Sequence, residues 1–75
     1  MNPVTLYRTD PAKNLRRFYR LDIQPDLFGN PCLVREYGRI EKSGQVRSIP
    51  YPTEDEARGA FQKQRATKER RGYAV

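Results

Sequence analysis

The sequence predicts an α+β fold: a small antiparallel β-sheet of about four strands with one C-terminal α-helix packed on one face. Up to residue 51, short runs of alternating apolar and polar residues are separated by turn-forming residues. After residue 52 the apolar spacing becomes that of an amphipathic helix. The chain has 75 residues, of which 36% are hydrophobic, so it can build only one small core. We therefore expect residues 1–75 to form a single domain, in which sheet and helix bury their apolar sides together.

The first two strands are expected at Val4–Thr9 and Leu15–Gln24, where apolar residues recur at every second position. Asp10–Asn14 lies between them and predicts a turn, because Asp-Pro opens turns and Asn14 tolerates a left-handed conformation. The loop Pro25–Pro31 follows and is rich in turn formers.

Two apolar residues of that loop, Leu27 and Phe28, are candidates for packing back on the core. The third strand is expected at Cys32–Ile40 and the fourth at Val46–Tyr51. A Ser-Gly turn within Glu41–Gln45 joins them into a hairpin.

The helix is expected at about Thr53–Arg71. Thr53 and Glu56 have the spacing of a capping box, and Gly72 is a typical helix stop. Its narrow apolar face comprises Ala57, Ala60, Phe61, Gln64 and Lys68. Because the helix dipole favours cations at this end, we interpret the basic residues of the last turns as a solvated helix terminus.

The charge balance favours a polyanionic partner. Fifteen Lys and Arg residues against nine Asp and Glu residues give a net charge of +6. Solubility alone would be compatible with this value. However, Arg, which outnumbers Lys, is the residue best suited to bidentate phosphate recognition. A polyanion is therefore the favoured class of partner: nucleic acid, an anionic lipid or an acidic protein surface.

Several other classes are disfavoured by what the composition lacks. The chain has no histidine and one cysteine, Cys32, which argues against His-based catalysis, a disulfide and most zinc sites. Cys32 falls in an apolar strand pattern and is expected to be buried. Without a long apolar run, no membrane association is expected. We expect a cytoplasmic protein with no enzyme activity, no cofactor and no small-molecule substrate.

The third expected strand carries the candidate site. Arg35, Tyr37 and Arg39 alternate along it and share one face, about 6.5–7 Å apart, a spacing comparable to that of phosphates along a nucleic-acid strand. Gly38 would let a ligand or another backbone approach closely, and Arg47 on the next strand faces the same side as Arg39. Alternatively, Tyr37 packs in the core and the arginines extend past it to water. The spacing leaves both interpretations open.

The segment "YGRIEKSGQVRS" resembles the WGR domain, a family named for its Trp-Gly-Arg motif. "FYRLDIQPDLFGNPCLVREYGRI" before it and "TEDEARGAFQKQRATKERRGY" after it extend the resemblance over about residues 7–73. It places Tyr37 at the Trp position, Gly38 at the Gly and Arg39 at the Arg. Tyrosine keeps an aromatic face but offers less stacking area.

The resemblance implies a small antiparallel sheet packed with a helix, and a nucleic-acid-binding role. In DNA-damage-dependent poly(ADP-ribose) polymerases, the Trp and Arg of the motif contact sugar and phosphate near a DNA end. This sequence shows no ADP-ribosylating catalytic domain, so that activity is not carried over.

Two functional hypotheses result. The first is a non-catalytic module that binds nucleic acid, with double-stranded DNA near ends or nicks, in preference to RNA, as the expected ligand. Its candidate site residues are Arg35, Tyr37, Gly38, Arg39 and Arg47. The second is a protein-interaction module that docks an acidic partner through the same Tyr and Arg face, since both residue types are enriched at interface hot spots.

Overall fold

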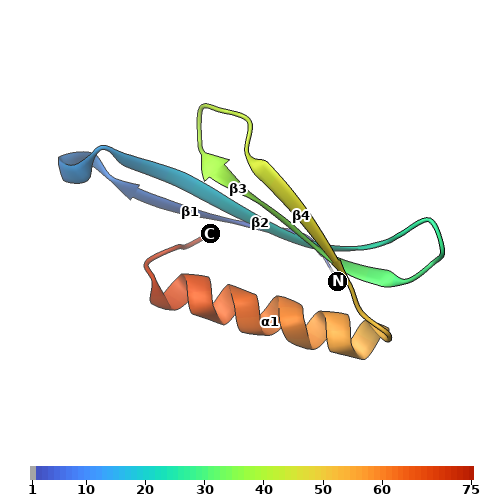
Figure 1. The fold of residues 1–75 in the computed structure, drawn as a ribbon. Helices are drawn as coiled ribbons and strands as arrows, with labels where there is room; N and C mark the ends of the chain where they lie inside the picture. Colours follow the sequence, from blue (N-terminus) through green and yellow to red (C-terminus); the bar gives the residue numbers. More distant parts are fainter. Residues whose placement is uncertain (1) are drawn as a thin grey trace.

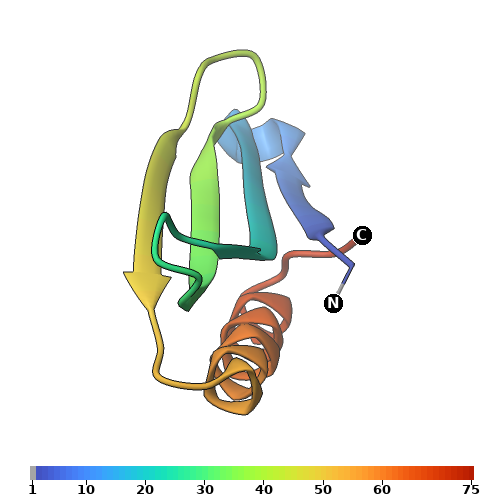
Figure 2. The same ribbon diagram turned by 90° about the vertical axis from the view of Figure 1, so that its right-hand side faces the viewer.

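The computed structural model describes residues 2–75 and consists of one four-stranded antiparallel sheet and one helix. The strands lie side by side in chain order, and the helix lies across one face of the sheet (Figures 1 and 2). The elements are β1 (Val4–Asp10), the 3₁₀ turn η1 (Pro11–Lys13), β2 (Leu15–Pro25), β3 (Pro31–Arg39), β4 (Gln45–Pro50) and α1 (Glu54–Arg70). The predicted α+β fold is confirmed.

The turn between β1 and β2 forms as its sequence predicts. The Asp10 carboxylate accepts a hydrogen bond from the backbone N–H of Ala12 at 3.1 Å. Asn14 then reverses the chain in the left-handed conformation, with φ at 51°. This places η1 at one end of the sheet.

The register of the strands decides which residues face α1. Tyr19 lies opposite Tyr37, Leu21 opposite Arg35, and Ile23 opposite Leu33. Since directly paired residues of an antiparallel sheet point to the same side, these residues share the face that α1 covers. The core on that face comprises Leu6, Tyr19, Leu21, Leu33, Phe61 and Tyr73.

Both ends of α1 are capped by local chemistry. At the N-terminus, Thr53 Oγ1 accepts a hydrogen bond from the backbone N–H of Glu56 at 3.2 Å. At the C-terminus, Gly72 has φ at 98°, and the backbone N–H of Tyr73 donates to the carbonyl of Lys68 at 3.1 Å. This pattern is a Schellman motif, and it turns the chain back toward the sheet.

After this turn the last residues add to the outer edge of β1. The backbone groups of Tyr7 and Ala74 exchange two hydrogen bonds, of 2.7 and 2.9 Å. Tyr73 is thereby buried between the helix end and the sheet. The free thiol of Cys32 is also buried, as expected from its apolar strand.

The loop between β2 and β3 departs from expectation. Leu27 and Phe28 do not pack back on the core, because their side chains are 100% and 89% exposed. They lie in a tight turn that Asp26 stabilises, because its carboxylate accepts hydrogen bonds from the backbone N–H groups of Phe28 and Asn30. In this hydrogen-bonded turn both apolar side chains are directed into solvent and not toward the core.

Candidate nucleic-acid interface

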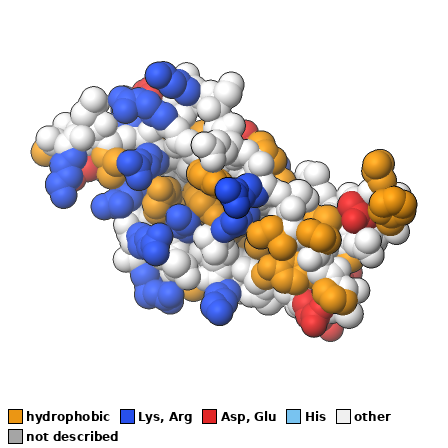
Figure 3. Space-filling model, viewed as in Figure 1, with side chains coloured by type: hydrophobic (Ala, Val, Ile, Leu, Met, Phe, Trp, Pro, Cys, Tyr) orange, Lys and Arg blue, Asp and Glu red, His pale blue; other side chains and the backbone are white. Residues whose placement is uncertain are grey.

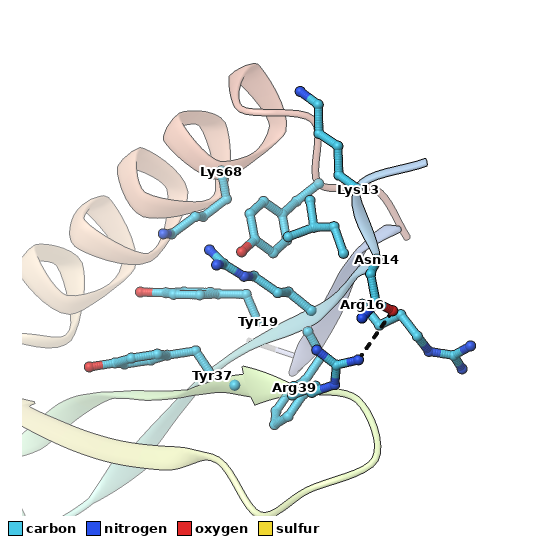
Figure 4. Close-up of a pocket in the computed structure, with 12 residues that line it drawn as sticks. Lys13, Asn14, Arg16, Tyr19, Tyr37, Arg39 and Lys68 are labelled. Carbon is cyan, nitrogen blue, oxygen red and sulfur yellow. Dashed lines mark hydrogen bonds between the residues drawn. The ribbon is translucent and has the colours of Figure 1, made fainter. Parts of the chain in front are cut away.

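A cavity of about 500 Å³ opens between the C-terminal part of α1 and the η1 end of the sheet (Figure 4). Its lining combines η1, β2, β3 and the helix end. Five of the residues that line the cavity are basic, and no Asp or Glu is among the lining residues. The basic residues are Lys13, Arg16, Arg17, Arg39 and Lys68. Most Lys and Arg side chains on this side of the molecule gather over the same half (Figure 3).

Two stacked tyrosines form one wall of the cavity. The rings of Tyr19 and Tyr37 have their centroids 5.5 Å apart and an interplanar angle of 13°. Tyr19 is buried, whereas Tyr37 is half-buried and its hydroxyl donates to Gln45 Oε1 at 3.3 Å. Tyr37 therefore combines features of both interpretations made from the sequence: it packs against the core, and it lines the cavity.

Arg39 lies at the mouth of the cavity. Its side chain is exposed, its Nη2 donates to Asn14 Oδ1 at 3.4 Å, and its Nε lies 3.5 Å from a carboxylate oxygen of Glu41 (Figure 4 shows the first contact). Glu41 also forms an ion pair with Arg16. These contacts are solvent-exposed, so they orient Arg39 without neutralising it strongly.

Arg17 is the cross-strand partner of Arg39 and also lines the cavity. Like charges directly opposite each other on a sheet are destabilising, unless an anion lies between them. The alternation of β2 places Arg17 on the same face as Leu15 and Tyr19. Only the register of β2 against β3 shows that it lies beside Arg39.

Arg35 and Arg47 pair with each other across β3 and β4, and neither lines the cavity. Arg47 is exposed on the edge strand. Arg35 is half-buried: its Nη1 donates to the Tyr19 hydroxyl at 3.3 Å, while its Nε is buried without a partner. Gln64 also donates to that hydroxyl, at 2.9 Å. Arg35 thus helps to position Tyr19 behind Tyr37.

The absence of a side chain at Gly38 allows the backbone of Gly44 to pack closely against it. A Cβ atom at this position would lie 2.9 Å from the Cα of Gly44, and one at Gly44 would lie 2.8 Å from Cζ of Phe18. Of the two approaches that the sequence left open, the structure shows the close packing of the β3–β4 turn on β3. Gly38 contributes to the cavity only as backbone.

Lys68 was missed by the interpretation of the sequence. It is not part of a fully solvated terminus, because its Nζ lies 4.4 Å from the ring centroid of Tyr19 and 5.5 Å from that of Tyr73. Burial, together with the positive charges of Arg71, Arg35 and Arg17, lowers the pKa of Lys68. Its place on the apolar face of the helix was the signal that could have revealed this position.

The described part of the chain, residues 2–75, offers no cluster of acidic, His and Cys side chains that could hold a metal ion. Nor does any helix within it have the length and apolarity needed to cross a membrane.

A family model described as the WGR domain matches residues 2–75. The chain belongs to the WGR domain family. WGR domains are small modules that generally bind nucleic acid and are not catalytic by themselves. Within this WGR domain, Tyr37-Gly38-Arg39 is the segment that resembles the motif that names the family.

The domain is also similar to the "Uncharacterized protein y4dW" of Sinorhizobium fredii (strain NBRC 101917 / NGR234), with 40% identity over 73 residues. The match covers 95% of this chain but only 36% of the relative. The chain thus spans about a third of the length of that relative. No solved structure matches the chain.

Proposed function

We propose that this WGR domain binds nucleic acid in the basic cavity, with double-stranded DNA near an end or a nick as its preferred ligand. One observation supports this above all: cationic side chains from four separate parts of the fold converge around a stacked tyrosine pair, and no acidic side chain lines the same space. Backbone phosphates are the ligand that such a concentration of positive charge favours.

In this proposal, Arg39 and Arg17 bind phosphate. Both guanidinium groups present planar sets of N–H donors that match phosphate oxygens. An anion between them would also relieve the repulsion of two directly paired cations. Lys68 adds a compact charge from the helix side of the cavity.

Tyr37 supplies the contact to sugar or base. One face of its ring rests on Tyr19, and its hydroxyl is held by Gln45, so the ring is fixed before a ligand arrives. Fixing an aromatic ring in advance lowers the entropy cost of binding. At an end or a nick the terminal sugar is accessible and one face of the terminal base can be exposed, whereas continuous duplex keeps both faces of each base stacked. A ring that contacts sugar or base therefore favours binding at ends and nicks.

The remaining candidates have supporting roles. Gly38 allows the β3–β4 turn to pack on β3. Arg35 orients Tyr19 from behind, and Arg47, exposed on the same sheet face, is available to a phosphate that continues past the cavity.

The proposal is tested by measuring the affinity for a labelled DNA duplex at several salt concentrations. If three to five phosphates are neutralised, log affinity falls against log salt with a slope of about −3 to −4.5. Arg39→Ala is expected to weaken binding about 10- to 100-fold, since it removes a charge-assisted hydrogen bond, and to reduce the slope by about 1. The control is Arg58→Ala, because Arg58 is exposed on α1, pairs with Glu54 and does not line the cavity.

A salt-independent affinity would contradict the proposal. Equal losses in the Arg39 and Arg58 variants would mean diffuse attraction to a basic surface instead of a site. Competition by an acidic polypeptide as effective as DNA of the same charge would favour the alternative in which this face docks an acidic protein.

A further inference from the structure

The loop between β2 and β3 holds two large apolar side chains in solvent. Leu27 and Phe28 are 100% and 89% exposed. The loop has a defined shape, because the Asp26 carboxylate accepts backbone hydrogen bonds from Phe28 and Asn30, both at 2.9 Å. A third bond joins the backbone N–H of Gly29 to the carbonyl of Asp26 at 3.1 Å. The two side chains therefore form a preorganised apolar knob that does not contribute to the core.

A shallow hollow, lined by four apolar residues together with Gly29, Thr53 and Glu54, lies beside this knob. It has a volume of about 350 Å³, within the range of sites that hold apolar groups in proteins. Its apolar lining is formed by Ile23, Pro25, Pro31 and Pro52. The backbone of the same loop contributes, since Gly29 is part of the wall.

We propose that this end of the molecule is a self-association surface, in which the Leu27–Phe28 knob of each copy occupies the hollow of the other. In a two-fold symmetric dimer, a surface patch contacts itself, so each copy must carry both a projecting element and its receptor. Knob and hollow lie side by side here, on and next to one loop. A second copy is therefore the partner that can cover the knob and fill the hollow at the same time.

The charges at this end disfavour nucleic acid or an anionic membrane as the occupant. Glu54 is among the residues that line the hollow, none of which is Lys or Arg. Asp55 and Glu56 follow it in the first turn of α1, and Asp26 lies under the knob. Phosphate-bearing surfaces would be repelled. In a dimer these acidic groups repel weakly across the interface, so screening by salt should favour association.

The size of the patch sets the strength of the dimer. Because only four side chains and two small hollows form its centre, the interface is expected to fall below the roughly 1,200 Å² typical of stable complexes, in the weak, transient class. In each copy the basic cavity is lined by residues at the η1 end of the sheet. That end lies opposite to the β2–β3 loop (Figure 1). Such a dimer would present two cavities that point away from each other.

The test is sedimentation velocity of the purified chain, without nucleic acid, between about 0.02 and about 1 mM protein. The weight-average mass is expected to rise from 8.8 kDa toward twice that value and to rise further at higher salt. Phe28→Ser and Leu27→Ser should each raise the dissociation constant at least tenfold, as loss of an interface anchor does. Both residues are exposed, so the variants should keep the wild-type amide spectrum outside the loop.

The matched control is Val46→Ser, because Val46 is also an exposed apolar residue, 63% accessible, on a different part of the sheet. It should associate like the wild type. Amide shifts that depend on concentration should include Ile23, Gly29 and Thr53 of the hollow as well as Phe28. A chain that stays at 8.8 kDa overturns the proposal, as do equal effects of the Phe28 and Val46 variants. Shifts confined to the basic cavity or to β4 would overturn it too.

Discussion

Lys68 is the single residue whose surroundings best illustrate the proposed anion site. Its stem follows the apolar face of α1, and its ammonium lies over Tyr19 among three arginines. Burial and these like charges both disfavour the charged form and lower its pKa. A bound phosphate would reverse the balance, since an opposite charge nearby stabilises the ammonium.

The first prediction concerns the pH dependence of DNA binding. The pKa of Lys68 is lowered in the free domain and should rise again in the complex. By linkage, the contribution of Lys68 to affinity is complete below the free-state pKa and is lost as the pH rises from that value toward the pKa of the complex. Affinity measured from neutral pH up to about pH 10 should therefore fall with rising pH.

Lys68→Arg is the control for this titration, because arginine stays charged throughout the range. The fall in affinity should be smaller in the variant. Identical pH profiles for both proteins would show that Lys68 does not contact the anion.

At the scale of elements, the β3–β4 hairpin depends on two glycines that face each other. The Cβ positions at Gly38 and Gly44 point into backbone atoms and into the ring of Phe18. Gly59, within α1, has open space around its Cβ position. Replacing glycine by alanine is therefore expected to lower the stability of the protein in the β3–β4 hairpin and to raise it in α1.

Gly38→Ala and Gly44→Ala should each lower the free energy of unfolding by about 1–3 kcal/mol, because the backbone must shift to admit a methyl group. Gly59→Ala should raise it by about 0.5–1 kcal/mol, because alanine favours the helix. Urea denaturation of the three variants measures both signs. A Gly44 variant as stable as the wild type would contradict the packing described for this turn.

Local chemistry made most elements predictable from the sequence. The helix was expected at Thr53–Arg71 and is observed at Glu54–Arg70 with Thr53 as its cap, because the capping box and Gly72 act within a few residues. The period-2 alternation that predicts the four strands is likewise a local signal, read over a few neighbouring residues. The turn at Asn14 followed from its own side-chain chemistry.

The arrangement of the candidate site depends on contacts between distant segments, which the sequence did not reveal. That Arg17 lies beside Arg39 follows from the register of β2 and β3, and that Lys68 reaches the same cavity follows from where α1 crosses the sheet. Phe28 shows the opposite case: apolarity suggested burial, but the hydrogen bonds of Asp26 hold the loop away from the core.

At the scale of the whole molecule, the two ends differ in chemistry. The described part of the chain is elongated, with extents of 44 × 24 × 16 Å. On the face shown in Figure 3, Lys and Arg side chains gather toward the η1 end, while acidic and apolar side chains gather at the end with the β2–β3 loop. The basic cavity and the apolar knob are therefore separated along the molecule, so nucleic-acid binding and self-association can be altered independently.

We propose above that nucleic acid occupies the cavity between η1 and the end of α1. The most direct measurement is an amide NMR titration of the ¹⁵N-labelled domain with blunt, nicked and circular DNA duplexes. We predict that the largest shift changes fall within residues 13–19, 37–39 and 68–73, that they are greatest with the blunt and nicked duplexes, and that the loop at residues 26–30 is unaffected. Changes concentrated on that loop or on β4, with the resonances of the cavity unmoved, would show that nucleic acid does not bind in the cavity.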